Sequence, residues 1–157
     1  MRCIVDDMKT NTEPQLPLEE AEAELAGDLA LLESWPDRYE YIIELGRSLP
    51  PYPDEWHTED REVFGCQSQV WLNADYEQGR LWFQADSNAL ITKGLVAMLV
   101  GLYSGRTLPE IQGASLNFLQ GLGLASHLTP SRVNGLHAMF KRIQQHAADA
   151  AVKEKLS

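Results

Sequence analysis

Apolar and polar residues alternate between residues 69 and 85, whereas apolar residues in the flanking segments recur at the spacing of a helix. Alternation places every second side chain on one face of a strand. It is interrupted at Glu77, Gln78 and Gly79, a sequence typical of a hairpin turn. An antiparallel hairpin between helical segments predicts an α+β fold.

Two helices are expected before the hairpin. Residues 18–32 carry apolar side chains on one face and mostly acidic side chains on the others. Ser34 is a suitable N-cap for a second helix, because Pro36 and Asp37 are typical of the first turn after such a cap. This helix should end near Gly46, before a proline-rich exit.

Four helices are expected after the hairpin. Residues 91–102 are apolar on most sides and therefore belong in the middle of the molecule, with Asp86 or Ser87 as the N-cap. Gly94 within this helix permits the close approach of another backbone. The other three are a short helix opened by a capping box at Thr107 and Glu110, a short helix over residues 115–124, and a long helix that begins at Thr129 and Pro130.

The length of 157 residues is within the usual size of one domain. Residues 1–17 are polar, contain two prolines and show no period, so we expect a mobile tail. Residues 18–157 should then form a single domain. Val63 and Phe64 are expected to add a third short strand to the sheet.

The charge and hydropathy of the chain argue against some classes of binding partner. The net charge of -10 argues against binding to nucleic acid, which needs clustered Lys and Arg. The most apolar run, residues 94–103, is shorter than the roughly 20 residues that cross a bilayer. Asp6 and Asp7 interrupt the N-terminus before a signal peptide could develop. We therefore expect a cytoplasmic protein with protein or small-molecule partners.

The cysteines and histidines do not predict a metal or a disulfide. Cys3 and Cys66 are far apart in a chain expected in a reducing compartment, so each should carry a free thiol. Two cysteines cannot supply the four thiolates that usually hold an iron–sulfur cluster. The histidines lack the spacing of zinc ligands; they are His57, His127, His137 and His146.

Cys66 is the residue most suggestive of chemistry, because it lies at the mouth of a strand and outside any apolar stripe. Gly65 before it permits backbone angles that could turn N–H groups toward the sulfur and favour the reactive thiolate. A lone cysteine can instead be a small buried apolar residue. A cysteine hydrolase that uses Cys66 with His57 or His127 is a further possibility.

Residues 65–71 read Gly-Cys-Gln-Ser-Gln-Val-Trp and resemble the sulfur-acceptor motif of the SufE family. Three more blocks resemble that family in order and spacing, namely residues 35–46, residues 86–95 and residues 127–136. The resemblance covers roughly residues 29–147. Cys3 falls outside it, and Asn88 stands where many members carry an acidic residue.

The resemblance implies a fold shared with IscU-type scaffolds, in which a small three-stranded antiparallel sheet packs against helices. It implies that Cys66 accepts sulfur as a persulfide from a SufS- or CsdA-like cysteine desulfurase and stimulates that enzyme. The sulfur would pass to a SufBCD-like iron–sulfur scaffold or another acceptor. Pyridoxal phosphate belongs to the desulfurase, and no cofactor is expected on this chain. The chain would be a carrier acting with the desulfurase, sheltering its cysteine in a loop that swings out on docking.

Several residues are candidates for support of Cys66 or contact with a partner. A cation at Arg132, in the first turn of the last predicted helix, opposes the helix dipole. Arg132 is therefore a candidate for contact with the Cys66 loop or the partner; the alternative is an exposed or carboxylate-paired arginine. A regulator that binds the desulfurase without carrying sulfur remains the competing function. The other candidates are Gly65, Gln67, Ser68 and Gln69.

Overall fold

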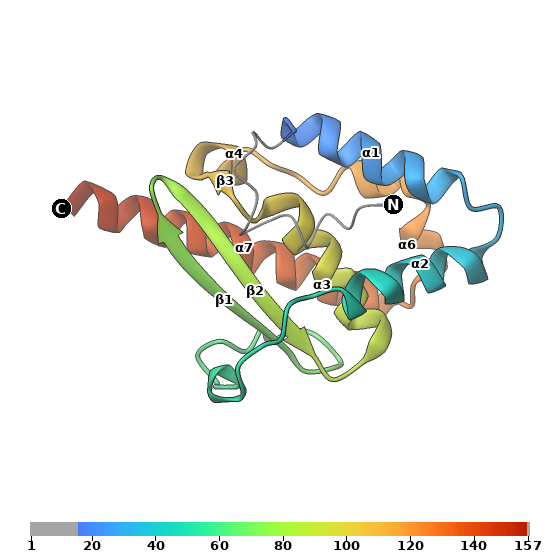
Figure 1. Cartoon of the computed structure of the whole chain (residues 1–157), viewed down its shortest axis with the longest axis horizontal. Coiled ribbons are helices and arrows are strands. Elements are labelled where there is room, and N and C mark those ends of the chain that lie inside the picture. Colours follow the sequence, from blue (N-terminus) through green and yellow to red (C-terminus); the bar gives the residue numbers. More distant parts are fainter. Residues whose placement is uncertain (1–15, 157) are drawn as a thin grey trace.

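A computed structural model describes residues 16–156 of the chain (Figure 1). Most of the predicted tail, residues 1–15 with Cys3, lies outside the described residues. The elements in chain order are α1 (Leu18–Ala30), α2 (Trp35–Arg47), the 3-10 turn η2 (Asp54–Trp56), β1 (Val70–Glu77), β2 (Arg80–Ser87), α3 (Leu90–Tyr103), β3 (Arg106–Thr107), α4 (Leu108–Gln112), α5 (Phe118–Leu122), α6 (Leu124–His127) and α7 (Pro130–Leu156).

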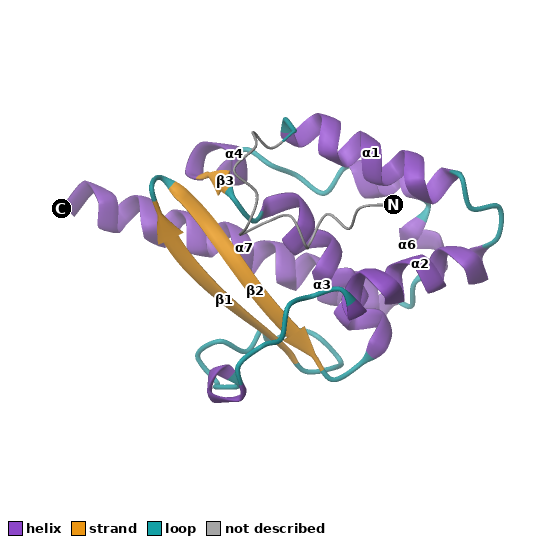
Figure 2. Ribbon diagram, in the orientation of Figure 1, coloured by secondary structure: helices purple, strands orange, loops and turns teal. Residues whose placement is uncertain are grey.

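The architecture is a sheet packed against helices. The three strands pair antiparallel in the order β1-β2-β3. Figure 2 shows the long hairpin of β1 and β2 running alongside α3 and crossing α7, with α1 and α2 on the other side of α3. The α+β class predicted from the change in period is therefore confirmed.

The hairpin forms as its alternation predicts. Val70 pairs with Ser87 at one end and Glu77 with Arg80 at the other. Gln78 and Gly79 join the strands with positive φ angles of 53° and 78°. Two such residues make the tight turn that matches the right-handed twist of a hairpin. The apolar residues of one face are buried, among them Val70, Leu72, Leu81, Phe83 and Ala85.

The third strand is not the one predicted. Arg106 and Thr107 form β3 against β2, whereas Phe64 is 67% exposed and unpaired in the sheet. Val63 does donate its N–H to the carbonyl oxygen of Val70 at 2.8 Å, beside an isolated bridge at Glu62. Pairing ends there because the chain turns sharply at the next residues, so this segment adds only an edge contact.

The predicted caps are confirmed at α2 and α4 and wrong at α3. Ser34 accepts the N–H of Asp37, and Thr107 forms a reciprocal capping box with Glu110. The N-cap of α3 is Ala89, without a side-chain cap. Asp86 and Ser87 still belong to β2, so their side chains have other partners.

The helix expected over residues 115–124 is divided. The structure has α5 and α6 there, separated by Gly123 with a φ of 71°. A positive φ ends a right-handed helix and lets the chain turn. The long helix α7 begins at Pro130 as predicted.

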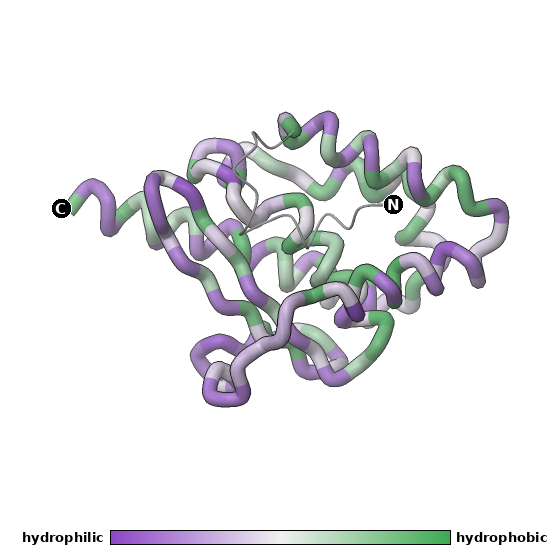
Figure 3. The backbone as a smooth tube through the Cα atoms, in the orientation of Figure 1, coloured by the Kyte–Doolittle hydropathy of each residue, from purple (hydrophilic) through white to green (hydrophobic). Residues whose placement is uncertain are grey.

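Helix α3 is the centre of the core. Eleven of its residues are buried, including every residue from Gly94 to Tyr103. Figure 3 shows apolar residues along this helix and hydrophilic residues at the hairpin turn. None of the helices within residues 16–156 combines the length and the apolar character needed to cross a membrane.

Helices α2 and α3 touch backbone to backbone. A Cβ atom on Gly94 would lie 2.2 Å from the carbonyl oxygen of Ile42, and one on Gly46 would lie 2.8 Å from the amide nitrogen of Gly94. Real Cβ atoms do not approach other atoms so closely. The absence of side chains at these two positions therefore sets how near the helices can lie.

We predict that Gly94→Ala lowers the free energy of unfolding by about 2 kcal/mol or more, because overpacking a core costs typically ~1–3 kcal/mol and here the obstacle is rigid backbone. Urea denaturation measures the change. Gly27→Ala is the matched control, since nothing lies within 4 Å of the added atom in the exposed face of α1. It should stabilise by about 0.5–1 kcal/mol. Equal effects of the two substitutions would contradict the close contact.

Candidate functional site

Cys66 lies in a loop, residues 64–69, between the Val63 pairing and the start of β1. Gly65 has a φ of 99°, which residues with a side chain rarely adopt. A Cβ atom there would also lie 3.2 Å from Cβ of Ala138 on α7. Glycine is therefore needed at this position for the turn and for the approach to α7.

The far end of the loop is tied to the start of α3. The side-chain oxygen of Asn88 accepts the N–H of Gln69 at 3.1 Å, and its amide nitrogen donates to the Gln69 side chain at 3.2 Å. Ser87 donates its hydroxyl to the Gln69 carbonyl oxygen at 2.7 Å. A carboxylate at position 88 could accept the first bond but could not donate the second. Asn88 is thus an anchor of the loop.

The thiol of Cys66 is half-buried against α7. Its Sγ donates to the carbonyl oxygen of Gly135 at 3.6 Å. Burial raises the pKa of the Cys66 thiol above its ordinary value, because the charged thiolate is poorly solvated there. A carbonyl acceptor also favours the protonated form. The expectation that the loop favours the thiolate is therefore wrong for this resting arrangement.

A hollow of about 270 Å³ lies beside the thiol. Gln67, Ser68 and Arg132 line it together with Cys66, so three of the five supporting candidates meet there. The hydroxyl of Thr92 lies 3.5 Å from that of Ser68. The remaining candidates, Gly65 and Gln69, shape the loop without lining the hollow.

Sequence reasoning missed several residues of this site. Thr92, Leu95, Ser131, Gly135 and Met139 also line the hollow. The helical period could have identified part of the set, because positions 132, 135 and 139 fall on one face of a helix. No local signal placed that face next to Cys66.

Arg132 is exposed at the start of α7. Its backbone N–H donates to the carbonyl oxygen of Thr129 at 3.0 Å, which fixes the first turn. Within residues 16–156 its guanidinium makes no hydrogen bond or ion pair. The cation is therefore available beside the thiol, and the carboxylate-paired alternative does not apply to the described residues.

Neither histidine considered for a hydrolase lines the hollow of Cys66. His57 bonds to the carboxylate of Asp86 at 2.7 Å, and the ring of His127 stacks on that of Trp35 with centroids 3.8 Å apart. A hydrolase needs its base within hydrogen-bond reach of the nucleophile. The described site lacks that arrangement.

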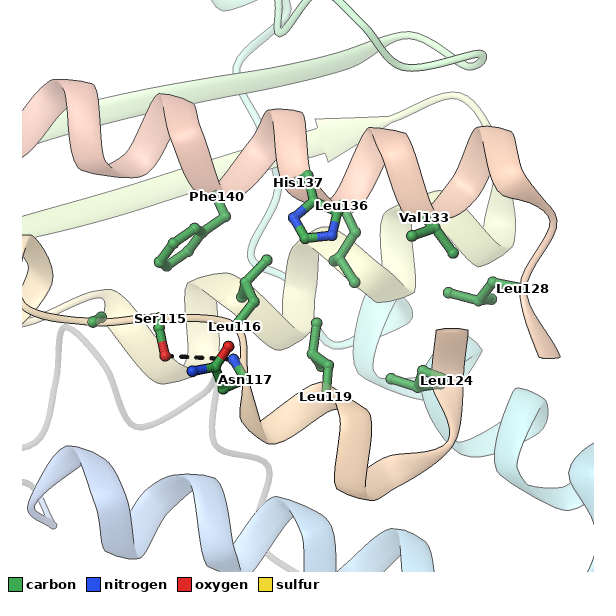
Figure 4. Close-up of a pocket in the computed structure, with 11 residues that line it drawn as sticks. Ser115, Leu116, Asn117, Leu119, Leu124, Leu128, Val133, Leu136, His137 and Phe140 are labelled. Atoms are coloured by element: carbon green, nitrogen blue, oxygen red, sulfur yellow. Dashed lines mark hydrogen bonds between the residues drawn. The ribbon is translucent and has the colours of Figure 1, made fainter. Parts of the chain in front are cut away.

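A second hollow of about 300 Å³ lies on another face of α7 (Figure 4). Most of the side chains that line it are apolar, and it shares no lining residue with the hollow of Cys66. His137 stands at its edge, and the N–H of Asn117 donates to Ser115 at 3.4 Å. Its lining contains no cysteine. In the described part of the chain, no three His, Cys, Asp or Glu residues gather as a metal site.

Comparison with known proteins identifies relatives over most of the chain. The family model described as SufE, Fe-S metabolism associated domain, matches residues 23–147. An uncharacterized SufE-like protein of Rhizobium meliloti (strain 1021) is 40% identical over 129 residues, 79% of this chain and 92% of that protein. The cysteine desulfuration protein SufE of Wigglesworthia glossinidia brevipalpis is 38% identical over 126 residues, 79% of this chain and 88% of that protein.

Two further comparisons concern a longer relative and the fold. SufE-like protein 1, chloroplastic/mitochondrial, of Arabidopsis thaliana is 38% identical over 141 residues, 87% of this chain but 38% of the plant protein. The solution structure of a hypothetical protein from Thermus thermophilus aligns with a TM-score of 0.71 at 23% identity, covering 84% of this chain and 96% of that one. The second likeness shows a shared fold.

We predict that the Cys66 thiol titrates above the roughly 8.5 of a free cysteine. Thiolate forms as pH rises through the pKa, so a raised pKa moves the onset of reactivity to higher pH. The rate of alkylation by iodoacetamide, followed against pH in a Cys3→Ser protein, measures this titration. The same protein unfolded in urea is the control and should show the ordinary value. A pKa of Cys66 that is lower in the folded than in the unfolded protein would contradict this prediction and would show that the loop favours the thiolate.

Proposed function

The chain belongs to the SufE family, and on that premise we propose that it carries sulfur as a persulfide on Cys66. The observation that carries the proposal is the placement of Cys66 in an anchored surface loop, beside a polar hollow and the guanidinium of Arg132, which has no partner among residues 16–156. The family description associates this domain with iron–sulfur metabolism. A cysteine kept only for packing would not need a cavity beside its sulfur.

The proposed transfer is a thiol exchange. The Cys66 thiolate attacks the outer sulfur of a persulfide on the desulfurase cysteine. A new S–S bond forms at Cys66 while the S–S bond in the donor breaks, and the donor cysteine leaves as its thiolate. The sulfur keeps its oxidation state, so no external oxidant or reductant is needed. In delivery, a thiolate of the acceptor attacks the outer sulfur of the Cys66 persulfide, and Cys66 leaves as its thiolate.

The resting geometry suits a carrier that reacts only with its partner. The raised pKa lowers the thiolate fraction of Cys66, and half-burial limits access, so adventitious reactions are slowed. The hollow of about 270 Å³ exceeds the roughly 15 Å³ that admits a water molecule. It therefore has room for one added sulfur atom. Docking must then bring the thiol toward the partner, which also restores its thiolate.

The proposed donor is a SufS- or CsdA-like cysteine desulfurase that this chain also stimulates. The Wigglesworthia relative is named a cysteine desulfuration protein, in keeping with such a donor. The donor would hold the pyridoxal phosphate. We propose a SufBCD-like iron–sulfur scaffold or another sulfur acceptor as the recipient, and the reducing cytoplasm as the compartment. The name of the Arabidopsis relative places that protein in organelles.

The second candidate is a desulfurase-binding regulator that holds no sulfur. The burial of the thiol and its bond to the Gly135 carbonyl favour this candidate, because both reduce the reactivity of Cys66. The two functions differ in one respect. A carrier must show sulfur on Cys66 after turnover, whereas a regulator need not.

We predict that Cys66→Ser retains the fold and desulfurase binding but loses sulfur acceptance, because serine is nearly isosteric and cannot form a persulfide. Protein incubated with a cysteine desulfurase and cysteine is analysed by intact mass spectrometry and peptide mapping. Wild type should gain sulfur on Cys66. Cys3→Ser is the control and should gain it equally. Sulfur mainly on Cys3, or on neither residue while the desulfurase turns over, would support the regulator.

We propose that the N-terminal tail contributes little to this transfer, since it lies outside the family match. Deleting residues 1–15 should leave sulfur acceptance nearly intact. Leu16 is retained because its carbonyl oxygen accepts from Arg106, a buried residue. Circular dichroism verifies the fold of the shortened chain. A large loss of acceptance with the fold preserved would show that the tail takes part.

A further inference from the structure

Cys66 rests directly on the backbone of α7 at Gly135. A Cβ atom on Gly135 would lie 3.4 Å from Sγ of Cys66 and 3.6 Å from both its Cα and its Cβ. Gly135 is itself buried, and its carbonyl oxygen accepts the thiol hydrogen bond. The loop cysteine therefore sits where a side chain of α7 would otherwise stand.

We infer that Gly135 is a positioning residue that sets how far Cys66 is withdrawn from solvent, an inference that rests on the proposed carrier function. The small residue leaves space for the thiol and for the sulfur added to it. A larger residue at position 135 fills that space and holds the loop in a more open arrangement. Gly135 thus controls the exposure of the sulfur without touching the partner.

The size of the added side chain decides the effect. An alanine methyl at 3.4–3.6 Å from Cys66 is in ordinary contact, so it fits with little movement. Valine adds two methyl groups that extend about 1.5 Å beyond Cβ, and its rotamer is restricted in a helix. The space for Sγ is then lost. We therefore expect Gly135→Ala to be tolerated and Gly135→Val to displace Cys66.

A larger side chain at position 135 should displace the Cys66 loop and leave α7 in place. On α7, Leu136, Met139 and Ile143 are buried beside Gly135 and hold the helix in the core. In the loop, Phe64, Gly65, Gln67 and Gln69 are exposed to solvent. The part of the loop between its anchors can therefore move outward at lower cost than α7.

Gly135 also controls how fast a thiol reductant removes the sulfur from the Cys66 persulfide. A thiol reductant removes it when its thiolate attacks the outer sulfur: the S–S bond to Cys66 breaks, and Cys66 leaves as a thiolate. A second reductant thiol then releases the sulfur as hydrogen sulfide, with formation of the reductant disulfide. Withdrawal of the persulfide into the hollow hinders the first attack. An open loop removes that protection.

The first test uses the thiol alone and needs no desulfurase. In a Cys3→Ser background, Gly135→Val should raise the rate of alkylation by iodoacetamide at neutral pH by about ten-fold, as one unit of pKa changes the thiolate fraction. Its pH profile should move toward that of the unfolded protein. Gly135→Ala should stay within about two-fold on the same scale. Asn134→Val, exposed on the same helix and outside the hollow, is the control and should change nothing.

The second test measures the persulfide. Each variant is loaded with inorganic polysulfide, whose S–S bond breaks as the Cys66 thiolate takes one sulfur atom. Loss of that sulfur to dithiothreitol, followed by mass spectrometry, should be faster in Gly135→Val than in wild type or Gly135→Ala. Circular dichroism verifies the fold, and Gly135→Ser replaces valine in both assays if the valine variant does not fold. It should then give an intermediate increase.

A folded Gly135→Val, or the serine variant in its place, with alkylation and persulfide loss unchanged from wild type would overturn the inference. Failure of the proposed function has a different signature. In that case the desulfurase gives no sulfur to Cys66 in wild type, while the Gly135 series still changes alkylation of the thiol. The two outcomes are therefore separable.

Discussion

The close contact between α2 and α3 is the constraint on which the rest of the structure depends. Gly94 lies against the backbone of Ile42, so the two helices form one rigid pair. Helix α3, buried from Gly94 to Tyr103, then supports the sheet on one side and α7 on another. Both ends of the Cys66 site are attached to this frame, through Asn88 before α3 and through Gly135 on α7. The position of the thiol is thus set by helix packing.

The elements of the fold that depend on nearby residues could be predicted from the sequence. The hairpin follows from alternation and a turn with positive φ angles, and the caps at Ser34 and Thr107 are satisfied within one turn. The third strand could not be predicted in this way. Arg106 and Thr107 form two pairs only, and their partner strand precedes them by a whole helix. Neither residue carries an apolar alternation of its own.

The features of the candidate site also separate into those set by nearby residues and those set by residues distant in the sequence. The motif indicated Cys66 and the need for Gly65, because both are properties of one short segment. The thiol is half-buried against Gly135, which is 69 residues away in the chain, and burial raises the pKa of the Cys66 thiol, opposite to the expected direction. The loss of water around the sulfur depends on residues that are distant in the sequence, so the residues next to Cys66 could not predict it.

The anchors of the loop limit how far its sulfur can travel. Residues 64–69 are held between the Val63 pairing and the Gln69 contacts with Asn88. Six residues extend to about 20 Å, so the apex of a loop fixed at both ends advances by only about 10 Å. A donor and an acceptor must therefore visit the same small footprint. Under the proposed function they cannot be bound together, and the carrier has to leave one before it meets the other.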